Sequence, residues 1–294
     1  SLGVPLGEVE LSTFANGEIY VRYLESIRGA DVFIVQSHST PINEHLFEQL
    51  IMIDAAKRAS AKRITAVCPF YGYARQDKKT EGREPITARL VADMLTAAGA
   101  DRVVAVDLHT GQIQGFFDMP VDHLTALPVL SSYLLDTIEG TPVVVSPDAG
   151  RVKLAQRLAN HLNADIAIID KRRPRHNVAV ASVIVGDVDG RACVLIDDMI
   201  DTAGTISSAA ELLINRGASV VYVAATHGVL SGPAIDRLKN APIKEVILTN
   251  TLPIENGKQF PELRVLSIAP IIADALDAVF EDTSVSQIFE GDNL

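Results

Sequence analysis

The stretch VLIDDMIDTAGTI, from Val194 to Ile206, ends an apolar run with two adjacent carboxylates. Asp197 and Asp198 repel each other, which costs stability unless a cation or a hydrogen-bond donor lies beside them. The residues before the pair indicate a buried strand, and those after it indicate a helix. The loop over residues 202–205 offers backbone N–H groups at the helix start, which favour an anion. Carboxylates accept hydrogen bonds from sugar hydroxyls or hold a hydrated metal, so the pattern predicts a ligand that is part sugar and part phosphate.

Four more apolar runs end in polar segments, and ligands of open α/β sheets bind at the carboxyl ends of strands. Basic residues at such ends hold phosphates, and an aspartate with a histidine suits a hydrated Mg²⁺. The segments contribute Arg75, Gln76, Asp77, Lys78 and Lys79; Asp107 and His109; Asp148; and Lys171, Arg172, Arg173 and Arg175. No Gly-x-x-x-x-Gly-Lys-Ser/Thr loop occurs, so a nucleotide would be held in another way.

Each of these segments also has a plain structural interpretation. A lone histidine such as His109 is more often structural than a ligand, and Asp148 stands where a helix cap is expected. The basic run over residues 171–175 is also typical of a solvated surface or a targeting patch. Their occurrence together in one chain favours a site for magnesium and phosphate groups.

The elements that must position these residues alternate between strands and helices. Nine short runs rich in Val and Ile are expected as strands, among them DVFIVQS, RITAVCPF and RACVLID. The apolar spacing predicts helices over Asn43–Ser60, Pro85–Gly99, Gly150–Leu162 and Ile206–Arg216. This alternation indicates mostly parallel sheets flanked by crossover helices. Nine strands are many for one small sheet, so two α/β domains of similar plan are expected.

The composition excludes several classes of protein. The chain has 294 residues, of which 48% are hydrophobic and 21% charged, as in a packed globular protein. Its net charge of −11 argues against a nucleic-acid partner, because nucleic-acid binders are usually basic. No apolar run is long enough to cross a bilayer, and Cys68 and Cys193 fall in expected buried strands. We therefore expect a cytoplasmic protein without a membrane partner.

A set of motifs between Val9 and Phe289 resembles a known family. In chain order they are YGYARQDKK, GREPITA, DLHTGQIQGFF, SPDAG, DKRRPR, DDMIDTAGT and ATHGVLSGPA. DDMIDTAGT alone is shared by type I phosphoribosyltransferases, whereas the ordered set resembles ribose-phosphate pyrophosphokinases of the phosphate-activated class. The resemblance implies two tandem phosphoribosyltransferase-like domains, over residues 1–125 and 126–279, with the tail at about 280–294 packed on the first.

The resemblance also implies a reaction and a site. The family transfers the diphosphoryl group of Mg-ATP to the anomeric hydroxyl of ribose 5-phosphate, giving phosphoribosyl pyrophosphate and AMP. The implied ribose 5-phosphate site is Asp197, Asp198, Asp201, Thr202, Ala203, Gly204 and Thr205. The implied ATP site is Phe14, Asn16, Glu18, Arg75, Gln76, Asp77 and His109, with Asp in place of Asn16 in some members. His109 and Asp148 match residues near magnesium, and Lys171 and Arg173 match the family's catalytic loop.

Assembly and control are further implications of the resemblance. The FANGEIYVR segment matches residues that reach the adenine of a neighbouring subunit, so a homo-oligomer of at least two chains is expected, with a hexamer as the family's assembly. The family's regulatory site, where phosphate activates and ADP inhibits, corresponds to Arg22, Ser284, Ser286 and Phe289. The alternative interpretation of Ser284, Ser286 and Phe289 is that they belong to an ordinary frayed C-terminal tail.

Two other functions stay open at this stage. A type I phosphoribosyltransferase would need only one such domain and a pocket for a base, and the ATP-type segments argue against it. A non-catalytic regulatory homologue would be expected to lose residues of the catalytic loop or the metal site, and this chain keeps Lys171, Arg173, His109 and Asp148.

Overall fold

The structure is a computed structural model that describes residues 2–172 and 181–289, with the backbone alone at both edges of the gap between them. The chain divides into two compact units. The first consists of Ser1–Thr125 together with Ala269–Leu294, and the second is Ala126–Ile268. The last helix therefore groups with the first unit, whereas the sequence-based ranges put it in the second.

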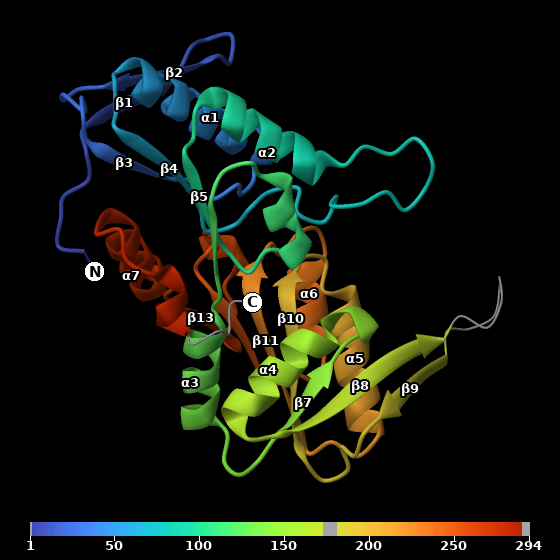
Figure 1. The fold of residues 1–294 in the computed structure, drawn as a ribbon. Coiled ribbons are helices and arrows are strands. Elements are labelled where there is room, and N and C mark those ends of the chain that lie inside the picture. The colour runs from blue at the N-terminus through green and yellow to red at the C-terminus, as the bar shows by residue number, and fades with distance from the viewer. Residues whose placement is uncertain (1, 173–180, 290–294) are drawn as a thin grey trace. The chain divides into compact units, whose positions relative to one another are not determined.

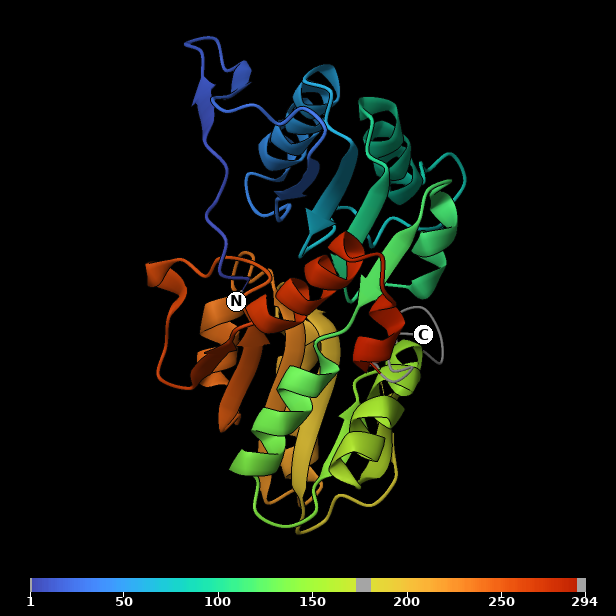
Figure 2. The ribbon, with the colours of Figure 1, turned by 60° about the vertical axis from the view of Figure 1, so that its left-hand side comes forward.

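The first unit is built on a parallel sheet of four strands in the order β3–β4–β5–β6 (Figure 1). The strands are Asp31–Val35 (β3), Arg63–Cys68 (β4), Arg102–Val106 (β5) and Val121–Leu124 (β6). Helices α1 (Ile42–Arg58) and α2 (Thr87–Ala98) lie side by side (Figure 2). Their apolar faces, with residues such as Ile53 and Leu95, join Ala66 and Val103 of the strands in one buried core. The carboxyl ends of all four strands meet at one edge, because the strands are parallel.

A hairpin, a helix and two short turns complete the first unit as the structure describes it. Strands β1 (Val9–Thr13) and β2 (Ile19–Tyr23) form an antiparallel hairpin, and β2 contacts α1. Helix α7 (Ala269–Phe280) contacts β6, which accounts for its place in this unit. Two 3₁₀ turns, Gly111–Phe116 (η1) and Val285–Phe289 (η4), follow β5 and α7.

The second unit is built on a sheet of seven strands in the order β13–β12–β11–β10–β7–β8–β9. The strands are Val143–Ser146 (β7), Asp165–Arg172 (β8), Ala181–Val185 (β9), Ala192–Ile200 (β10), Val220–Gly228 (β11), Glu245–Thr249 (β12) and Leu263–Leu266 (β13). All neighbouring strands are parallel except β8 and β9, which are antiparallel. The central strands are almost wholly buried, as expected for a parallel sheet covered on both faces.

The strand order of the second unit reverses between β7 and β10. The chain leaves β7 through α4 (Val152–Leu162) to β8 on one side, and leaves β10 through α5 (Gly204–Asn215) to β11 on the other. Figure 1 shows α4 and α5 on opposite faces of the sheet, as right-handed crossovers in opposite directions require. The helices of this unit are Leu127–Thr137 (α3), Val152–Leu162 (α4), Gly204–Asn215 (α5) and Ala234–Asn240 (α6), with short turns Ala149–Arg151 (η2) and Asn256–Lys258 (η3). Ligands of open α/β sheets bind outside the carboxyl ends of strands at such a reversal.

The predicted elements agree well with the structure. The predicted α/β fold with mostly parallel sheets is confirmed, and all nine expected strands and all four expected helices occur among the described residues. One prediction was wrong in its extent: the strand expected to end at Asp197 continues to Ile200, because β10 stays paired with β11 up to Gly228. Strands β1, β2, β6 and β9 were missed, since they are short and lie in a hairpin or at a sheet edge.

Candidate functional site

The acidic pair lies at the point where the second sheet reverses. Asp197 and Asp198 occupy the last part of β10, whose neighbour β7 leads into η2 and Arg151. Arg151 Nε lies 3.0 Å from Asp197 Oδ1, and Arg151 Nη2 lies 2.9 Å from Asp198 Oδ1. The side chains of Asp198 and Arg151 are only 6% and 17% exposed, so both ion pairs are shielded from bulk water. The cation that the acidic pair requires is therefore Arg151, a residue that the sequence analysis did not single out.

The electrostatics of the pair are set by burial and by its neighbours. Burial raises the pKa of Asp197 to about 8, and a hydrogen bond and the charge of Asp198 act in the same direction. Arg151 opposes these effects by favouring the ionised carboxylate. The backbone N–H of Asp198 also donates to Asp197 Oδ1 over 2.9 Å. A carboxyl whose pKa is raised in this way and that is flanked by a second acid is well suited to share hydrogen bonds with hydroxyl groups.

The loop after β10 leads directly into the N-terminus of α5. Ala203 precedes the helix with φ of 58°, in the left-handed region that residues with a Cβ rarely adopt, and no side chain caps the helix. The guanidinium of Arg237 donates to the carbonyl of Thr202 over 2.9 Å. The N–H of Ser231 donates to the carbonyl of Asp201 over 3.0 Å. The ATHGVLSGPA segment, whose Ser231 lies here, therefore supports a loop that presents backbone N–H groups to an anion.

Asp148 follows β7 and keeps part of the structural role considered for it. Its Oδ1 accepts the backbone N–H of Gly150 over 2.8 Å, so it caps η2. The hydroxyl of Ser146 donates to the Asp148 carbonyl over 2.6 Å, which fixes the turn. Asp148 belongs to the same unit as the acidic pair and follows the strand next to β10.

The segments predicted to bind ATP meet at the carboxyl ends of β4 and β5. The hydroxyl of Thr110, one residue after His109, donates to Asp77 Oδ2 over 2.7 Å. Gln76 is held by the hydroxyl of Thr87, which donates to its Oε1 over 2.5 Å. These bonds join the loop after β4 with the loop after β5 and with the start of α2. His109 lies in the first unit and Asp148 in the second.

The other predicted ATP residues are in the β1–β2 hairpin. Its turn is closed by Glu18 N–H, which donates to Asn16 Oδ1 over 3.2 Å, and by Phe14 N–H, which donates to the Glu18 carbonyl over 2.8 Å. Phe14 is 54% exposed and packs edge-to-face on Tyr20, with the ring centroids 5.7 Å apart. An exposed aromatic side chain at the tip of a hairpin is available to a ligand or to another chain.

Lys171, one of the two predicted catalytic cations, lies in β8 near its carboxyl end. The backbone of Lys171 pairs with Ser182 of β9, next to the carboxyl end of β7. Arg173 lies outside the described residues. Strands β8, β7 and β10 are parallel neighbours, so the carboxyl end of β8 lies on the same side of the sheet as the acidic pair at the end of β10.

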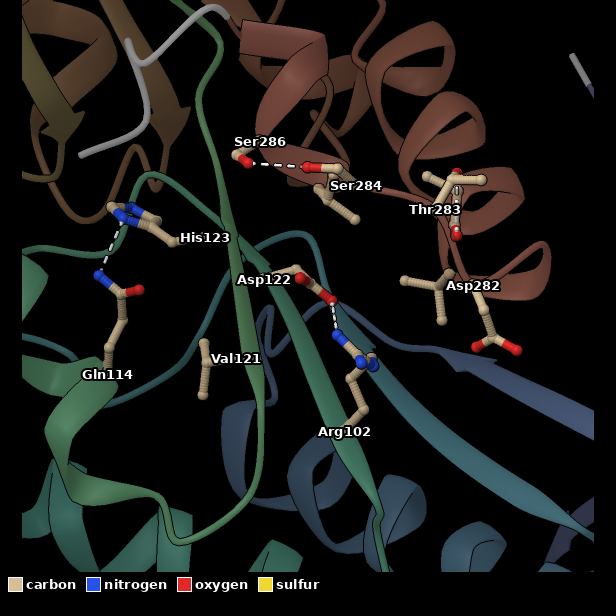
Figure 3. A pocket seen from close by; sticks show the side chains of 12 residues that line it. Arg102, Gln114, Val121, Asp122, His123, Asp282, Thr283, Ser284 and Ser286 are labelled. Carbon is tan, nitrogen blue, oxygen red and sulfur yellow. Dashed lines mark hydrogen bonds and ion pairs between the residues drawn. The ribbon is translucent and has the colours of Figure 1, made fainter.

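A polar pocket of about 410 Å³ in the first unit includes two of the residues predicted to be regulatory (Figure 3). Ser284 Oγ and Ser286 Oγ, which line it, lie 2.9 Å apart. Arg102 lines the pocket as well and is paired with Asp122 over 2.6 Å. The two hydroxyls and the guanidinium are groups that hold phosphates, and the carboxylates of Asp122 and Asp282 line the same pocket and oppose an anion.

The remaining predicted regulatory residues are placed differently. Phe289 is only 3% exposed, so in this structure its ring packs in the interior and is not offered to a ligand. Arg22 lies in β2 and is not among the described residues that line the pocket. Gln114 and His123 line it instead, with Gln114 Nε2 3.5 Å from His123 Nδ1 (Figure 3). Gln114 lies within the DLHTGQIQGFF motif but was not singled out from it, and His123 lies outside all the motifs.

Comparisons with known proteins agree over almost the whole chain. Residues 1–99 match the family model of the N-terminal domain of ribose phosphate pyrophosphokinase, and residues 173–290 match that of the phosphoribosyl synthetase-associated domain. A ribose-phosphate pyrophosphokinase of Streptomyces coelicolor is 59% identical over 98% of this chain and 90% of its own length. That of Clostridium tetani is 55% identical over 98% of this chain and 91% of its own.

A solved structure gives the same result. The crystal structure of phosphoribosylpyrophosphate synthetase from Mycobacterium smegmatis matches with a TM-score of 0.90 and 56% identity, over 96% of this chain and 93% of the other. The fold and the loop after β10 define an α/β enzyme with phosphoribosyltransferase-like domains. The chain belongs to the ribose-phosphate pyrophosphokinase family, as its motifs predicted.

Proposed function

We propose that this chain transfers the diphosphoryl group of Mg-ATP to the anomeric hydroxyl of ribose 5-phosphate, and so supplies phosphoribosyl pyrophosphate for nucleotide biosynthesis. Its family membership supports this reaction. The observation that carries the proposal is the buried pair Asp197–Asp198, which is braced by Arg151 in front of the uncapped N-terminus of α5. We place the reaction in the cytoplasm, where nucleotides are made.

In this proposal the two ends of the sugar phosphate are bound by different groups. The carboxylates of Asp197 and Asp198 accept hydrogen bonds from the ribose hydroxyls. The phosphate is held by the backbone and hydroxyl groups of the loop formed by Asp201, Thr202, Ala203, Gly204 and Thr205. The partial positive charge at the N-terminus of α5 adds to this binding.

ATP is bound in this proposal by the segments that meet beyond β4 and β5. Arg75 binds phosphate, while Gln76, Asp77 and His109 contact the nucleotide or its hydrated metal. Phe14, Asn16 and Glu18 of the hairpin reach the adenine in a neighbouring subunit, so the active unit is a homo-oligomer, with a hexamer as the expected assembly. The exposure of Phe14 supports such a shared role.

The donor chemistry is suited to Mg²⁺ as the metal of the reaction. Within residues 2–172 and 181–289, no group of three or more His, Cys, Asp or Glu side chains forms a metal site alone. Mg²⁺ ordinarily keeps several waters and binds one or two carboxylates together with substrate phosphates, a role that Asp148 would fill. As a nitrogen donor, His109 is better suited to a phosphate oxygen or a metal-bound water. When bound, Mg²⁺ would neutralise phosphate charge.

The chain's own contribution to the transfer is alignment and positive charge. Phosphoryl transfer requires little covalent chemistry from the protein, so positioning and electrostatic stabilisation dominate. Lys171 and Arg173 stabilise the negative charge that develops on the transferred group. Asp197, whose pKa is raised by burial, accepts hydrogen bonds from the sugar hydroxyls and so orients them.

Effectors act in this proposal at the pocket lined by Ser284 and Ser286. Phosphate binds their hydroxyls and activates, and ADP competes for the same place and inhibits. Phe289 is buried here, so it belongs to the site only if the tail is rearranged. Arg22 belongs to the site only if the tail is rearranged or a neighbouring chain supplies it.

Within the described chain, no helix has the combined length and apolar character that crossing a membrane would require.

The test of the reaction is the release of AMP from ATP on addition of ribose 5-phosphate. AMP release at a normal rate would exclude both a phosphoribosyltransferase and a non-catalytic homologue. The Asp198→Ala variant should then raise the KM for ribose 5-phosphate much more than that for ATP, since lost charge-assisted hydrogen bonds cost about 2–4 kcal/mol. Equal effects on both constants would count against the assigned sugar site.

A further inference from the structure

A buried polar cluster lies in the core of the first unit, where apolar side chains would be expected. His38 follows β3, Gln49 is on α1, and Cys68 ends β4, with exposed fractions of 1%, 0% and 0%. His38 Nε2 lies 2.9 Å from Gln49 Oε1, and Cys68 Sγ lies 3.4 Å from the same oxygen. Polar groups buried in this way lower stability unless each is hydrogen-bonded. All three are bonded here, so the cluster forms a specific link between β3, α1 and β4.

The hydrogen bonds determine which nitrogen of His38 carries the proton. The backbone N–H of Gly72 donates to His38 Nδ1 over 2.9 Å, so this nitrogen is an acceptor. The proton is therefore on Nε2, which donates to Gln49. The Gln49 amide donates to the carbonyls of Ile34 and Val67, at 3.2 and 3.4 Å. The ends of β3 and β4 are thus connected through two side chains to Gly72.

Gly72 has no room for a side chain at this contact. A Cβ built on it would lie 2.8 Å from His38 Cβ and 3.2 Å from His38 Nδ1. The close approach lets the backbone N–H reach the imidazole. Burial lowers the pKa of His38 to about 4, so the ring stays neutral near neutral pH and can accept this bond.

The segment that starts at Gly72 carries the residues proposed to bind ATP. Its far end is held by separate contacts: the N–H of Ala88 donates to the Gln76 carbonyl over 3.1 Å, and Thr110 holds Asp77. Between these contacts Tyr73 adopts a φ of 64°, which is unusual for a side chain of its size. The path of the turn is therefore held at both ends by hydrogen bonds. At its start, His38 accepts the Gly72 N–H, and the Tyr73 hydroxyl donates to Asn43 Oδ1.

We propose that His38 and Gln49 are positioning residues for ATP: they hold Gly72, and through it the turn over residues 73–77. The inference rests on the proposed ATP-binding role of Arg75, Gln76 and Asp77. Neither His38 nor Gln49 touches the nucleotide. The neutral imidazole with its proton on Nε2 is the form that fits, because a second proton on Nδ1 would face the Gly72 N–H.

Two isosteric variants separate the two bonds of the imidazole. In His38→Asn, the amide oxygen can take the place of Nδ1 and accept the Gly72 N–H. In His38→Gln, the amide nitrogen can take the place of Nε2 but no acceptor is left for Gly72. His38→Gln should raise the KM and the Kd for ATP about tenfold, which corresponds to one lost hydrogen bond, and His38→Asn should restore most of this loss. The KM for ribose 5-phosphate should stay unchanged in both.

The control is His45→Asn, a nearby histidine that contacts Ser39 rather than Gly72. It should leave ATP binding unchanged. If His38→Gln does not fold, Gly72→Ala provides the same test, because its Cβ displaces His38 and should weaken ATP binding in the same way. A lower melting temperature with an unchanged Kd for ATP would overturn the positioning role.

A parallel variant distinguishes this inference from the function on which it rests. If Arg75→Ala leaves ATP binding unchanged, the assignment of the turn to ATP is wrong, whatever His38 does. If Arg75→Ala weakens ATP binding while His38→Gln and Gly72→Ala do not, the turn binds ATP but His38 does not position it.

Discussion

Arg151 Nε lies 3.0 Å from Asp197 Oδ1, and this ion pair joins the turn that follows β7 to the neighbouring strand β10 at the reversal of the second sheet. The same guanidinium reaches Asp198. Two adjacent acids that would otherwise repel each other are thereby kept close together in a largely buried place. Breaking such a pair by removing one partner is costly, because it leaves uncompensated charge.

The first prediction concerns Arg151. Arg151→Gln should raise the KM for ribose 5-phosphate by about tenfold to a hundredfold, because hydrogen bonds to charged groups contribute about 1.5–3 kcal/mol. The pKa of Asp197 should rise further without its cation, so ribose 5-phosphate should bind well only at higher pH than in the wild type. The measurement is the KM for each substrate between about pH 6 and pH 9. Lys153→Gln, on the exposed start of α4, is the control, and an unshifted pH profile would contradict the prediction.

The second prediction concerns Lys171 at the end of β8. Lys171→Ala should lower kcat by about a hundredfold or more with little change in either KM, because the cation acts on charge that develops in the transition state. Steady-state kinetics on the purified variant is the measurement. Lys244→Ala removes a lysine that lies over the Tyr222 ring, and it should retain full turnover. Nearly full turnover of Lys171→Ala would remove this residue from catalysis.

The third prediction concerns regulation through the pocket of the first unit. The hydroxyls of Ser284 and Ser286 lie 2.9 Å apart, close enough for both to bind one phosphate group. The double variant Ser284→Ala with Ser286→Ala should weaken phosphate activation and ADP inhibition together, and ADP inhibition of the wild type should not be competitive with ATP. Initial rates across ADP and phosphate concentrations test this. Purely ATP-competitive inhibition that is unchanged in the double variant would exclude a regulatory site here.

The fourth prediction is a pH dependence of stability that arises from His38. Its folded-state pKa of about 4 lies below the ordinary value of 6.5, so the folded protein binds this proton less readily than the unfolded chain. The free energy of unfolding should therefore be highest above pH 6.5. It should decrease by about 3 kcal/mol as the pH falls toward 4, because the unfolded chain then binds the proton that the folded protein excludes. Other groups titrate in this range, so the measurement is the difference in urea unfolding between wild type and His38→Asn. An equal pH dependence of both proteins would contradict the buried neutral histidine.

The fifth prediction concerns the β1–β2 hairpin. Phe14→Ala should weaken ATP binding by about 1–3 kcal/mol if the exposed ring stacks on adenine in a neighbouring subunit. Phe47→Ala, which removes a similarly exposed phenylalanine on α1, is the matched control for ATP affinity. Light scattering and the KM for ATP are measured on the same samples. A monomer with full turnover would exclude an ATP site shared between subunits.

Much of this protein follows from local features of the sequence. The Val- and Ile-rich runs and the apolar spacing between them predicted nine strands and four helices correctly, because these patterns depend on neighbours close in the chain. The order of the motifs predicted the family. The short edge strands β6 and β9 were missed because they bury too little to show a clear pattern, and the extra length of β10 comes only from its pairing with β11.

The contacts that organise the sites were decided by tertiary structure alone. Arg151 meets Asp197 because β7 and β10 are neighbours in the sheet, and no local pattern of the sequence specifies that order. In the same way, Gln49 of α1 reaches the ends of β3 and β4 and, through His38, the backbone of Gly72. Sequence periodicity determines which elements form, since it reflects what each segment must bury. Ion pairs and buried hydrogen bonds link residues far apart in the chain, so they exist only after the sheets have brought those elements together.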